Sequence, residues 1–149
     1  MKAILLRRPG GPSALEYVDV PTPVPRDGEV LVRADTIGVS MPEVLVRKGV
    51  YAWMPPLPAI PGIEMTGMVV GHGRNVAGPA IGQPVFVSAR DLPIRAGCYA
   101  EYIAVPASGS TVLSATLAGV ATTAWISLVR LSTPKCAFMP KYHWLPFFV

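Results

Sequence analysis

The sequence predicts a mainly β domain with a compact, barrel-like sheet and one short helix over about residues 1–110. Three observations support this fold class. Short β-prone runs recur along the chain, turns rich in glycine and proline separate them, and one helix carries signals at both of its ends. Residues 111–149 follow a different pattern, which predicts a second helix and a divergent tail.

The first strands are expected over residues 2–8 and 15–20, on either side of the turn Pro9-Gly10-Gly11-Pro12. A proline-rich linker and the pair Asp27-Gly28 then lead into a longer strand over residues 29–39. Apolar side chains alternate with other residues along the start of this run, as in a half-buried strand. Three more strands are expected over residues 65–71, 84–89 and 98–105.

A short helix is expected over residues 40–48. Ser40 and Glu43 have the spacing of a capping box, in which the hydroxyl accepts from the amide of Glu43 and the Glu43 carboxylate accepts from the amide of Ser40. Pro42 falls in the first turn, where its missing N–H does no harm, and Gly49 provides the stop signal.

A second helix is expected over residues 112–131, because apolar side chains recur there at steps of three and four. These are Leu113, Leu117, Val120, Ala124, Leu128 and Leu131. No charged residue lies between Glu101 and Arg130, so a membrane-spanning helix is an alternative. Hydroxyl side chains around the apolar stripe favour a helix covered by protein, and we do not expect a membrane span.

The charge pattern excludes a typical nucleic-acid-binding surface. The chain has 13 basic and 9 acidic residues, and the basic ones are scattered rather than clustered on one element. The two cysteines have neither metal-site spacing nor the pattern of a disulfide framework. The N-terminus lacks the order of a signal peptide, and the expected location is therefore the cytoplasm.

A series of short motifs runs in order between residues 38 and 106. They are Gly38-Val39-Ser40, Arg47-x-Gly49-x-Tyr51, Pro61-Gly62-x-Glu64, Gly67-x-Val69, Val76…Gly82-x-x-Val85 and Ala100-Glu101-Tyr102…Val105-Pro106. Together they resemble the zinc-independent quinone oxidoreductase branch of the medium-chain dehydrogenase/reductase superfamily. The resemblance implies the GroES-like catalytic domain of that family, a twisted β-barrel that is normally followed by a Rossmann domain for the cofactor.

The resemblance also indicates whether the chain has the zinc ligands of related enzymes. Zinc-dependent members of the superfamily place a cysteine just after the third strand and a histidine in a Gly-His-Glu motif. Val39 or Ser40 and Ile63 stand at these positions, and none of them binds zinc as a thiolate or an imidazole does. We therefore expect no zinc site.

Five residues match positions at the family's substrate and cofactor cleft, and each also has a structural interpretation. They are Ser40, Glu43, Arg47, Tyr51 and Glu64. Ser40 replaces an asparagine near the nicotinamide ribose, although it is also the helix cap. Tyr51 matches an aromatic position lining the substrate pocket, or else packs in its loop. Arg47 is either the family's buried arginine or a charge on the surface of the helix.

The two acidic matches have structural alternatives as well. Glu43 matches an acidic position of the family, and the capping box explains it equally well. Glu64 would be costly to bury without partners, and we expect it to hold the loop at the cleft rather than to act as an acid or base. Thr123 lies in a segment that resembles the entry into the cofactor domain and is a weaker cofactor-binding candidate.

No G-x-G-x-x-G run follows a strand, so the sequence lacks the signature of a pyrophosphate site and a Rossmann domain is not expected within it. We expect residues 1–110 to be a GroES-like catalytic domain and residues 111–149 the truncated start of the connection to a cofactor domain. The function expected is that of an NADPH-dependent reductase of quinones or electron-poor carbonyl compounds, inactive alone and binding NADPH poorly. The alternative is a non-enzymatic assembly module that self-associates through residues 112–131.

Overall fold

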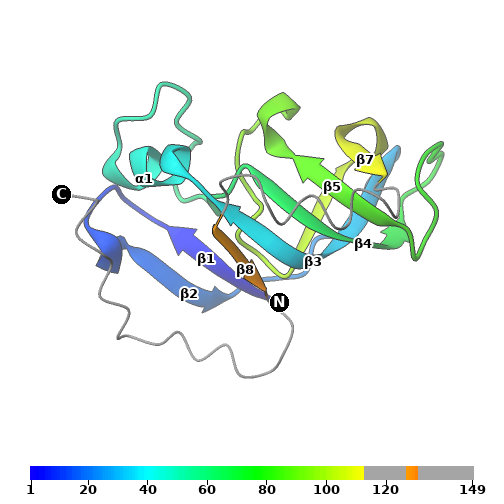
Figure 1. The fold of residues 1–149 in the computed structure, drawn as a ribbon, viewed down its shortest axis with the longest axis horizontal. Helices are drawn as coiled ribbons and strands as arrows, with labels where there is room; N and C mark the ends of the chain where they lie inside the picture. The colour runs from blue at the N-terminus through cyan, green and yellow to red at the C-terminus, as the bar shows by residue number, and fades with distance from the viewer. Residues whose placement is uncertain (113–126, 131–149) are drawn as a thin grey trace.

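The computed structural model describes residues 1–112 and 127–130, and it is mainly β, as the sequence predicts (Figure 1). Eight strands and one α-helix, α1 (Met41–Lys48), lie in this part of the chain. The strands are β1 (Lys2–Leu6), β2 (Leu15–Asp19), β3 (Glu29–Val39), β4 (Glu64–His72), β5 (Pro84–Ser88), β6 (Tyr102–Pro106), β7 (Ser110–Val112) and β8 (Ser127–Arg130). Three short 3-10 turns add η1 (Pro12–Ala14), η2 (Ala89–Asp91) and η3 (Ala107–Gly109).

The strands form two antiparallel sheets. One is the β1–β2 hairpin, and the other follows the order β6-β3-β4-β5-β7. β6 pairs with the first half of β3 and β8 with residues 36–39, so the two strands follow one another along the same side of β3. In the described residues no ladder joins β6 to β7, so the barrel expected from the sequence does not close. The hairpin meets the rest of the domain through single bridges, Ala3 with Ala100 and Leu6 with Ala59, instead of continuous pairing.

A β-bulge in β3 changes which residues face the core. The pairing with β4 shifts between Ala34 and Thr36, where β3 advances by two residues and β4 by one. Because side chains alternate between the two faces of a strand, an extra residue reverses the alternation. Val30 and Val32 are buried before the bulge, and Ile37 is buried after it. The core cluster also contains Met65, Val69, Val85, Val87, Ala89, Cys98, Tyr99, Ile103 and Val105.

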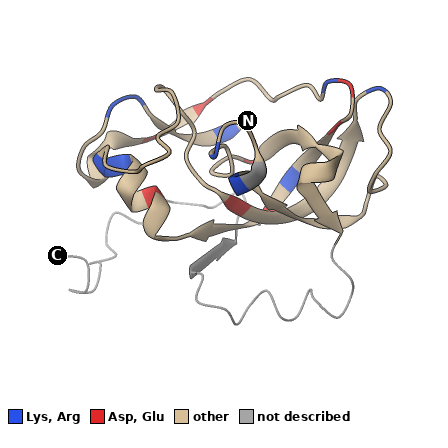
Figure 2. Cartoon of the chain, turned by 90° about the horizontal axis from the view of Figure 1, so that it is seen from above, with Lys and Arg blue, Asp and Glu red and all other residues tan. Residues whose placement is uncertain are grey.

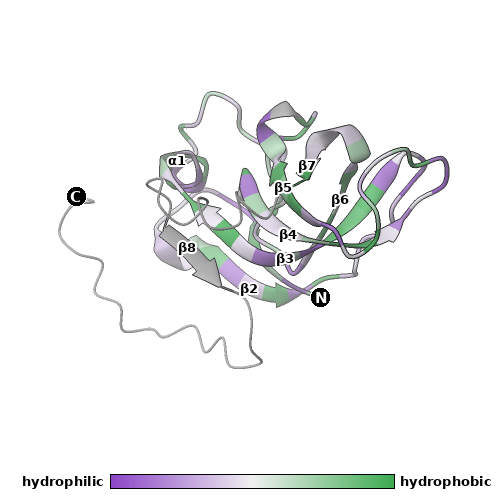
Figure 3. Ribbon diagram, turned by 45° about the vertical axis from the view of Figure 1, so that its right-hand side comes forward, coloured by the Kyte–Doolittle hydropathy of each residue, from purple (hydrophilic) through white to green (hydrophobic). Residues whose placement is uncertain are grey.

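Figure 3 shows apolar and polar residues following one another along the strands of the larger sheet. One face of this sheet therefore supplies the core, as expected when a strand is half-buried. In the cartoon of Figure 2 the basic and acidic positions are spread along the described chain instead of gathering on one element. No helix in the described residues is long and apolar enough to cross a membrane.

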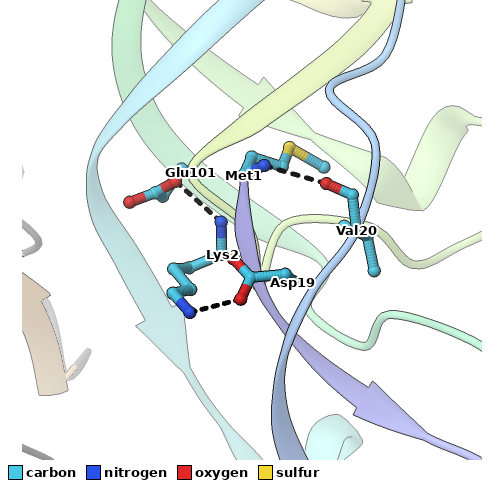
Figure 4. A network of polar contacts seen from close by, with 5 residues as sticks. All are labelled: Met1, Lys2, Asp19, Val20 and Glu101. Carbon is cyan, nitrogen blue, oxygen red and sulfur yellow. Dashed lines mark hydrogen bonds and ion pairs between the residues drawn. The ribbon is translucent and has the colours of Figure 1, made fainter.

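Polar contacts attach the start of the chain to both neighbours of β1 (Figure 4). The terminal ammonium of Met1 donates to the Val20 carbonyl at 2.8 Å, and Lys2 Nζ lies 2.6 Å from Asp19 Oδ2. The backbone N–H of Lys2 donates to Glu101 Oε2 at 2.7 Å. The β1–β2 hairpin is thereby joined to the segment that enters β6.

Most predicted elements have the expected place, with two corrections. β6 begins at Tyr102 and not at residue 98, because the backbone of Cys98 and Tyr99 bonds to Pro61 and Gly62. The helix expected over residues 112–131 is wrong at its described ends, where Val112 ends β7 and residues 127–130 form β8. Residues 127–130 pair with the side of β3 that β6 leaves free, and this pairing provides partners for their backbone N–H and C=O groups. The periodicity of the local sequence cannot predict such a distant partner. Residues 113–126 and 131–149 lie outside the described part, and the division near residue 110 stays a prediction.

Candidate functional site

The candidate site begins where β3 ends and α1 starts. Ser40 is the extended N-cap of α1 and forms the predicted capping box with Glu43. Glu43 Oε2 accepts hydrogen bonds from the backbone N–H and the hydroxyl of Ser40, both at 2.8 Å. Gly49 ends the helix with φ of 76°, in the left-handed region that glycine tolerates. The local sequence signals therefore fix this helix at both ends.

Glu43 also connects the helix to a distant loop. Its side chain is 6% exposed and is the one buried charged group among the described residues. Its second carboxylate oxygen, Oε1, accepts from the backbone N–H of Ile63 at 3.1 Å. Three donors thus surround a carboxylate whose burial would otherwise be costly. We call this arrangement of Ser40, Glu43 and Ile63 the Glu43 lock.

The loop held by the Glu43 lock packs closely against residues 97–99. Gly62 has φ of 96°, and a Cβ atom there would lie 2.4 Å from Cδ1 of the Tyr99 ring. The carbonyl of Gly62 accepts a hydrogen bond from the backbone N–H of Cys98 at 3.1 Å, and the carbonyl of Pro61 accepts one from Tyr99 at 2.9 Å. Only glycine fits between the left-handed backbone and the ring.

Glu64 follows this loop at the start of β4 and is half-buried. Its side chain lies over Gly38, since a Cβ on Gly38 would be 2.5 Å from Glu64 Cγ. Burial raises the pKa of the Glu64 carboxyl, the positive charge of Arg90 opposes this, and the negative charge of Glu43 adds to it. Within the described residues the Glu64 carboxylate has no hydrogen bond or ion pair.

Two buried groups lie next to these carboxylates. Burial raises the pKa of the Cys98 thiol to about 12, with smaller contributions from Glu43 and Glu64. Burial likewise raises the pKa of Tyr99, whose hydroxyl is buried without a hydrogen-bond partner in the described part of the chain. Neither group is ionised near neutral pH, so neither provides a nucleophile.

Arg47 and Tyr51 have other neighbours. Arg47 Nη1 donates to the carbonyl of Gly10 at 2.6 Å and attaches the helix to the turn after β1. The Tyr51 ring packs edge-on against Trp53, with centroids 5.6 Å apart. The guanidinium of Arg95 lies 4.7 Å from the centroid of the Trp53 ring.

The structure therefore brings Ser40, Glu43 and Glu64 together, while Arg47 binds the Gly10 turn and Tyr51 joins an aromatic group. Thr123 lies outside the described residues. Sequence reasoning missed Trp53 and Arg95, whose contact joins two loops that are 42 positions apart in the numbering. The sequence did contain one indication of this group: a tryptophan lies two positions after Tyr51, in a loop without the apolar periodicity of a helix or strand.

Other sites in the described residues are poor candidates. No group of three or more His, Cys, Asp or Glu side chains in residues 1–112 and 127–130 could hold a metal ion. An open pocket of about 320 Å³ lies between the start of the chain and β6. Its lining includes Met1, Val20, Ile60 and Tyr102 but none of the residues predicted from the sequence.

Comparisons with known proteins identify the family of this domain. The sequence model described as "Alcohol dehydrogenase GroES-like domain" matches residues 26–115. Human quinone oxidoreductase is 34% identical over 103 residues, which make up 68% of this chain and 30% of the human protein. The rat synaptic vesicle membrane protein VAT-1 homolog is 34% identical over 86 residues, or 58% of this chain and 20% of that protein.

Solved structures give the same result. Escherichia coli quinone oxidoreductase complexed with NADPH superposes with a TM-score of 0.70 and 26% identity, over 78% of this chain and 34% of that chain. The human synaptic vesicle membrane protein VAT-1 homolog-like protein superposes with a TM-score of 0.70 and 28% identity, over 77% of this chain and 36% of that chain. This chain thus spans about a third of the length of these relatives, and its similarity to quinone oxidoreductases is confirmed. By its sequence match and its fold, the chain belongs to the alcohol dehydrogenase GroES-like domain family.

Proposed function

We propose that this domain forms the substrate side of a cytoplasmic, zinc-independent reductase that uses NADPH to reduce quinones or electron-poor carbonyl compounds. The Glu43 lock carries the proposal, because it holds the end of β3 and the loop before β4 in one fixed arrangement. Human and Escherichia coli proteins named quinone oxidoreductase share this domain with the chain. Fixed positioning of a substrate beside a hydride donor is how a protein without a metal accelerates such a reaction.

The residues at the end of β3 fit the nicotinamide end of NADPH. Ser40 is half-buried and its hydroxyl proton is donated to Glu43, and a hydroxyl oxygen has two lone pairs, so one would remain for a ribose hydroxyl even within the capping box. When bound, NADPH would supply the hydride. With this hydride and one proton from water, a quinone would become a hydroquinone and the cofactor would become NADP⁺.

We assign positioning roles to the carboxylates. Glu43 accepts three hydrogen bonds, so it keeps Ser40 and Ile63 in place and has little freedom to exchange a proton with a substrate. Glu64 lies over Gly38, and we assign it the role of packing the start of β4 against the end of β3. Zinc independence is supported by the chemistry at the two diagnostic positions, because Ser40 has a hydroxyl in place of a thiolate and Ile63 is buried and apolar.

A chimera tests the proposal. The chain's first 110 or so residues would replace the corresponding domain of the Escherichia coli enzyme, following the boundary expected from the sequence. We expect the chimera to oxidise NADPH in the presence of a simple quinone, whereas the 149-residue chain alone does not. In the chimera, Ser40→Ala should raise the KM for NADPH more than it lowers kcat. A folded chimera without quinone reduction would refute the proposal, and turnover by the chain alone would refute its dependence on a second domain.

A further inference from the structure

Three side chains form an aromatic and cationic group on two loops, one after α1 and one between η2 and β6. Trp53 is 57% exposed, although tryptophan is usually well covered in a folded domain. Tyr51 meets it edge-on at 5.6 Å and an interplanar angle of 64°. The guanidinium carbon of Arg95 lies 4.7 Å from the centre of the indole ring. We call Trp53 and Arg95 the indole–guanidinium pair.

Among the side chains that the structure describes, Arg95 contacts the Trp53 ring and has no carboxylate partner. Within the described residues it makes neither an ion pair nor a hydrogen bond, whereas Arg7 and Arg74 pair with carboxylates and Arg47 bonds to Gly10. An arginine carries five N–H donors in a planar array. The stacked guanidinium of Arg95 therefore keeps its charge and its donors available for a ligand.

Both members of the pair are attached to the candidate site. The loop that carries Trp53 continues into Ile63, which donates to Glu43. The segment that carries Arg95 continues into residues 97–99, whose backbone bonds to Pro61 and Gly62. The pair thus lies on the two chain segments that meet where residues 97–99 bond to Pro61 and Gly62.

The chemistry of the pair defines a class of ligand. An exposed indole offers a flat, electron-rich surface on which an electron-poor ring stacks, and an unpaired guanidinium attracts a negative charge at the edge of that ring. We propose that Trp53 and Arg95 determine substrate specificity by binding quinones that carry an anionic substituent on the ring system. This inference rests on the proposed function, since it names the class of quinone that the site takes.

Binding to the full 149-residue chain tests the inference without cofactor. Equilibrium dialysis would compare anthraquinone sulfonate with the uncharged hydroxymethyl anthraquinone. The wild-type chain should bind the sulfonate more tightly. Trp53→Ala should weaken binding of the sulfonate about five- to tenfold, and Arg95→Gln about fivefold with less than about a twofold effect on the uncharged compound. Arg95→Lys should recover only part of the loss, because lysine keeps the charge but not the planar array.

Tyr17 offers a matched control on the β1–β2 hairpin. It is 53% exposed and has Lys2 Nζ 5.5 Å from its ring centroid, so it is a second exposed aromatic ring with a cation over it. Tyr17→Ala should leave binding of both compounds unchanged. Circular dichroism of every variant should match that of the wild-type chain, because the substituted side chains are exposed or half-buried.

Two results would overturn the inference. One is equal affinity of the wild-type chain for the charged and uncharged compounds, which needs no variant to observe. The other is an equal loss of binding in Tyr17→Ala and Trp53→Ala, which would indicate general adsorption to aromatic rings. If the chimera reduces quinones and either of these two binding results is found, the proposed function stands and only the role of Trp53 and Arg95 in specificity is refuted. The expected binding pattern without any reduction would refute the proposed function and leave an anion-selective aromatic site.

Discussion

The carboxylate of Glu43 accepts a hydrogen bond from the backbone N–H of Ile63, with 3.1 Å between Oε1 and the nitrogen, across 20 positions of the chain. Its other oxygen accepts from Ser40, so one side chain holds a helix start and a distant loop. Glu43 is 6% exposed, and these donors offset the cost of removing its charge from water. The geometry of the candidate site therefore depends on this carboxylate.

Replacing Glu43 with alanine should lower the free energy of unfolding by about 2–4 kcal/mol, because the backbone N–H groups of Ile63 and Ser40 both lose the carboxylate that accepts from them. Urea unfolding followed by circular dichroism measures this. Glu16→Ala is the control, since it removes a carboxylate from an exposed ion pair with Arg7 and should cost less than about 1 kcal/mol. Equal losses in the two variants would show that the Glu43 lock does not stabilise the domain.

Gly62→Ala should destabilise the domain far more than Gly28→Ala. Both glycines have positive φ, 96° and 74°, but a Cβ at position 62 meets the Tyr99 ring at 2.4 Å, whereas at position 28 it meets nothing within 4 Å. The strained backbone alone should cost about 1–2 kcal/mol at either position. Displacement of the ring should add about 1–3 kcal/mol at position 62. Urea midpoints that shift equally would mean that the Tyr99 ring moves aside freely.

Glu64→Gln should change how stability depends on pH. The pKa of Glu64 is raised in the folded chain, mainly by burial, so the folded state holds this proton more tightly than the unfolded state. The resulting stabilisation is present below the ordinary value of 4.5 and is lost as pH rises through the folded pKa. The variant should therefore lose less stability than the wild type between about pH 4 and about pH 7.

Urea unfolding of the wild type and of Glu64→Gln across this pH range measures how the Glu64 carboxyl changes the free energy of unfolding. Glu16→Gln controls for the loss of one negative charge at the surface, where Glu16 pairs with Arg7. If both variants follow the same pH profile, the Glu64 carboxyl is not destabilised by its surroundings.

Cys98 should be unreactive in the folded protein. Its thiol is fully buried and its pKa is raised to about 12, so almost none is the reactive thiolate at about pH 8. In a Cys136→Ser background, Ellman's reagent should label the remaining thiol only after urea is added. Stoichiometric labelling in native buffer would show that residues 97–99 open readily, which would also weaken the packing against Gly62.

Local chemistry was enough to predict several elements. The cap at Ser40, the carboxylate at Glu43 and the glycine at position 49 act within a few residues of one another, so they define α1 wherever the helix sits. Alternation along residues 29–34 likewise predicted a half-buried strand, because burial of every second side chain follows from strand geometry. The series of motifs from Gly38 to Pro106 was sufficient to identify the fold family.

Tertiary pairing decided the remaining features. The bulge near Asp35, the pairing of residues 127–130 with β3 and the contact of Ile63 with Glu43 all join segments that are far apart in sequence. The contact of Trp53 with Arg95 is of the same kind. The periodicity of residues 112–131 predicted a helix, yet residues 127–130 form a strand, since an available backbone edge outweighs a weak local preference. Sequence alone determined the family and the local caps, whereas the partners of buried or stacked side chains depend on which distant segments the fold brings together.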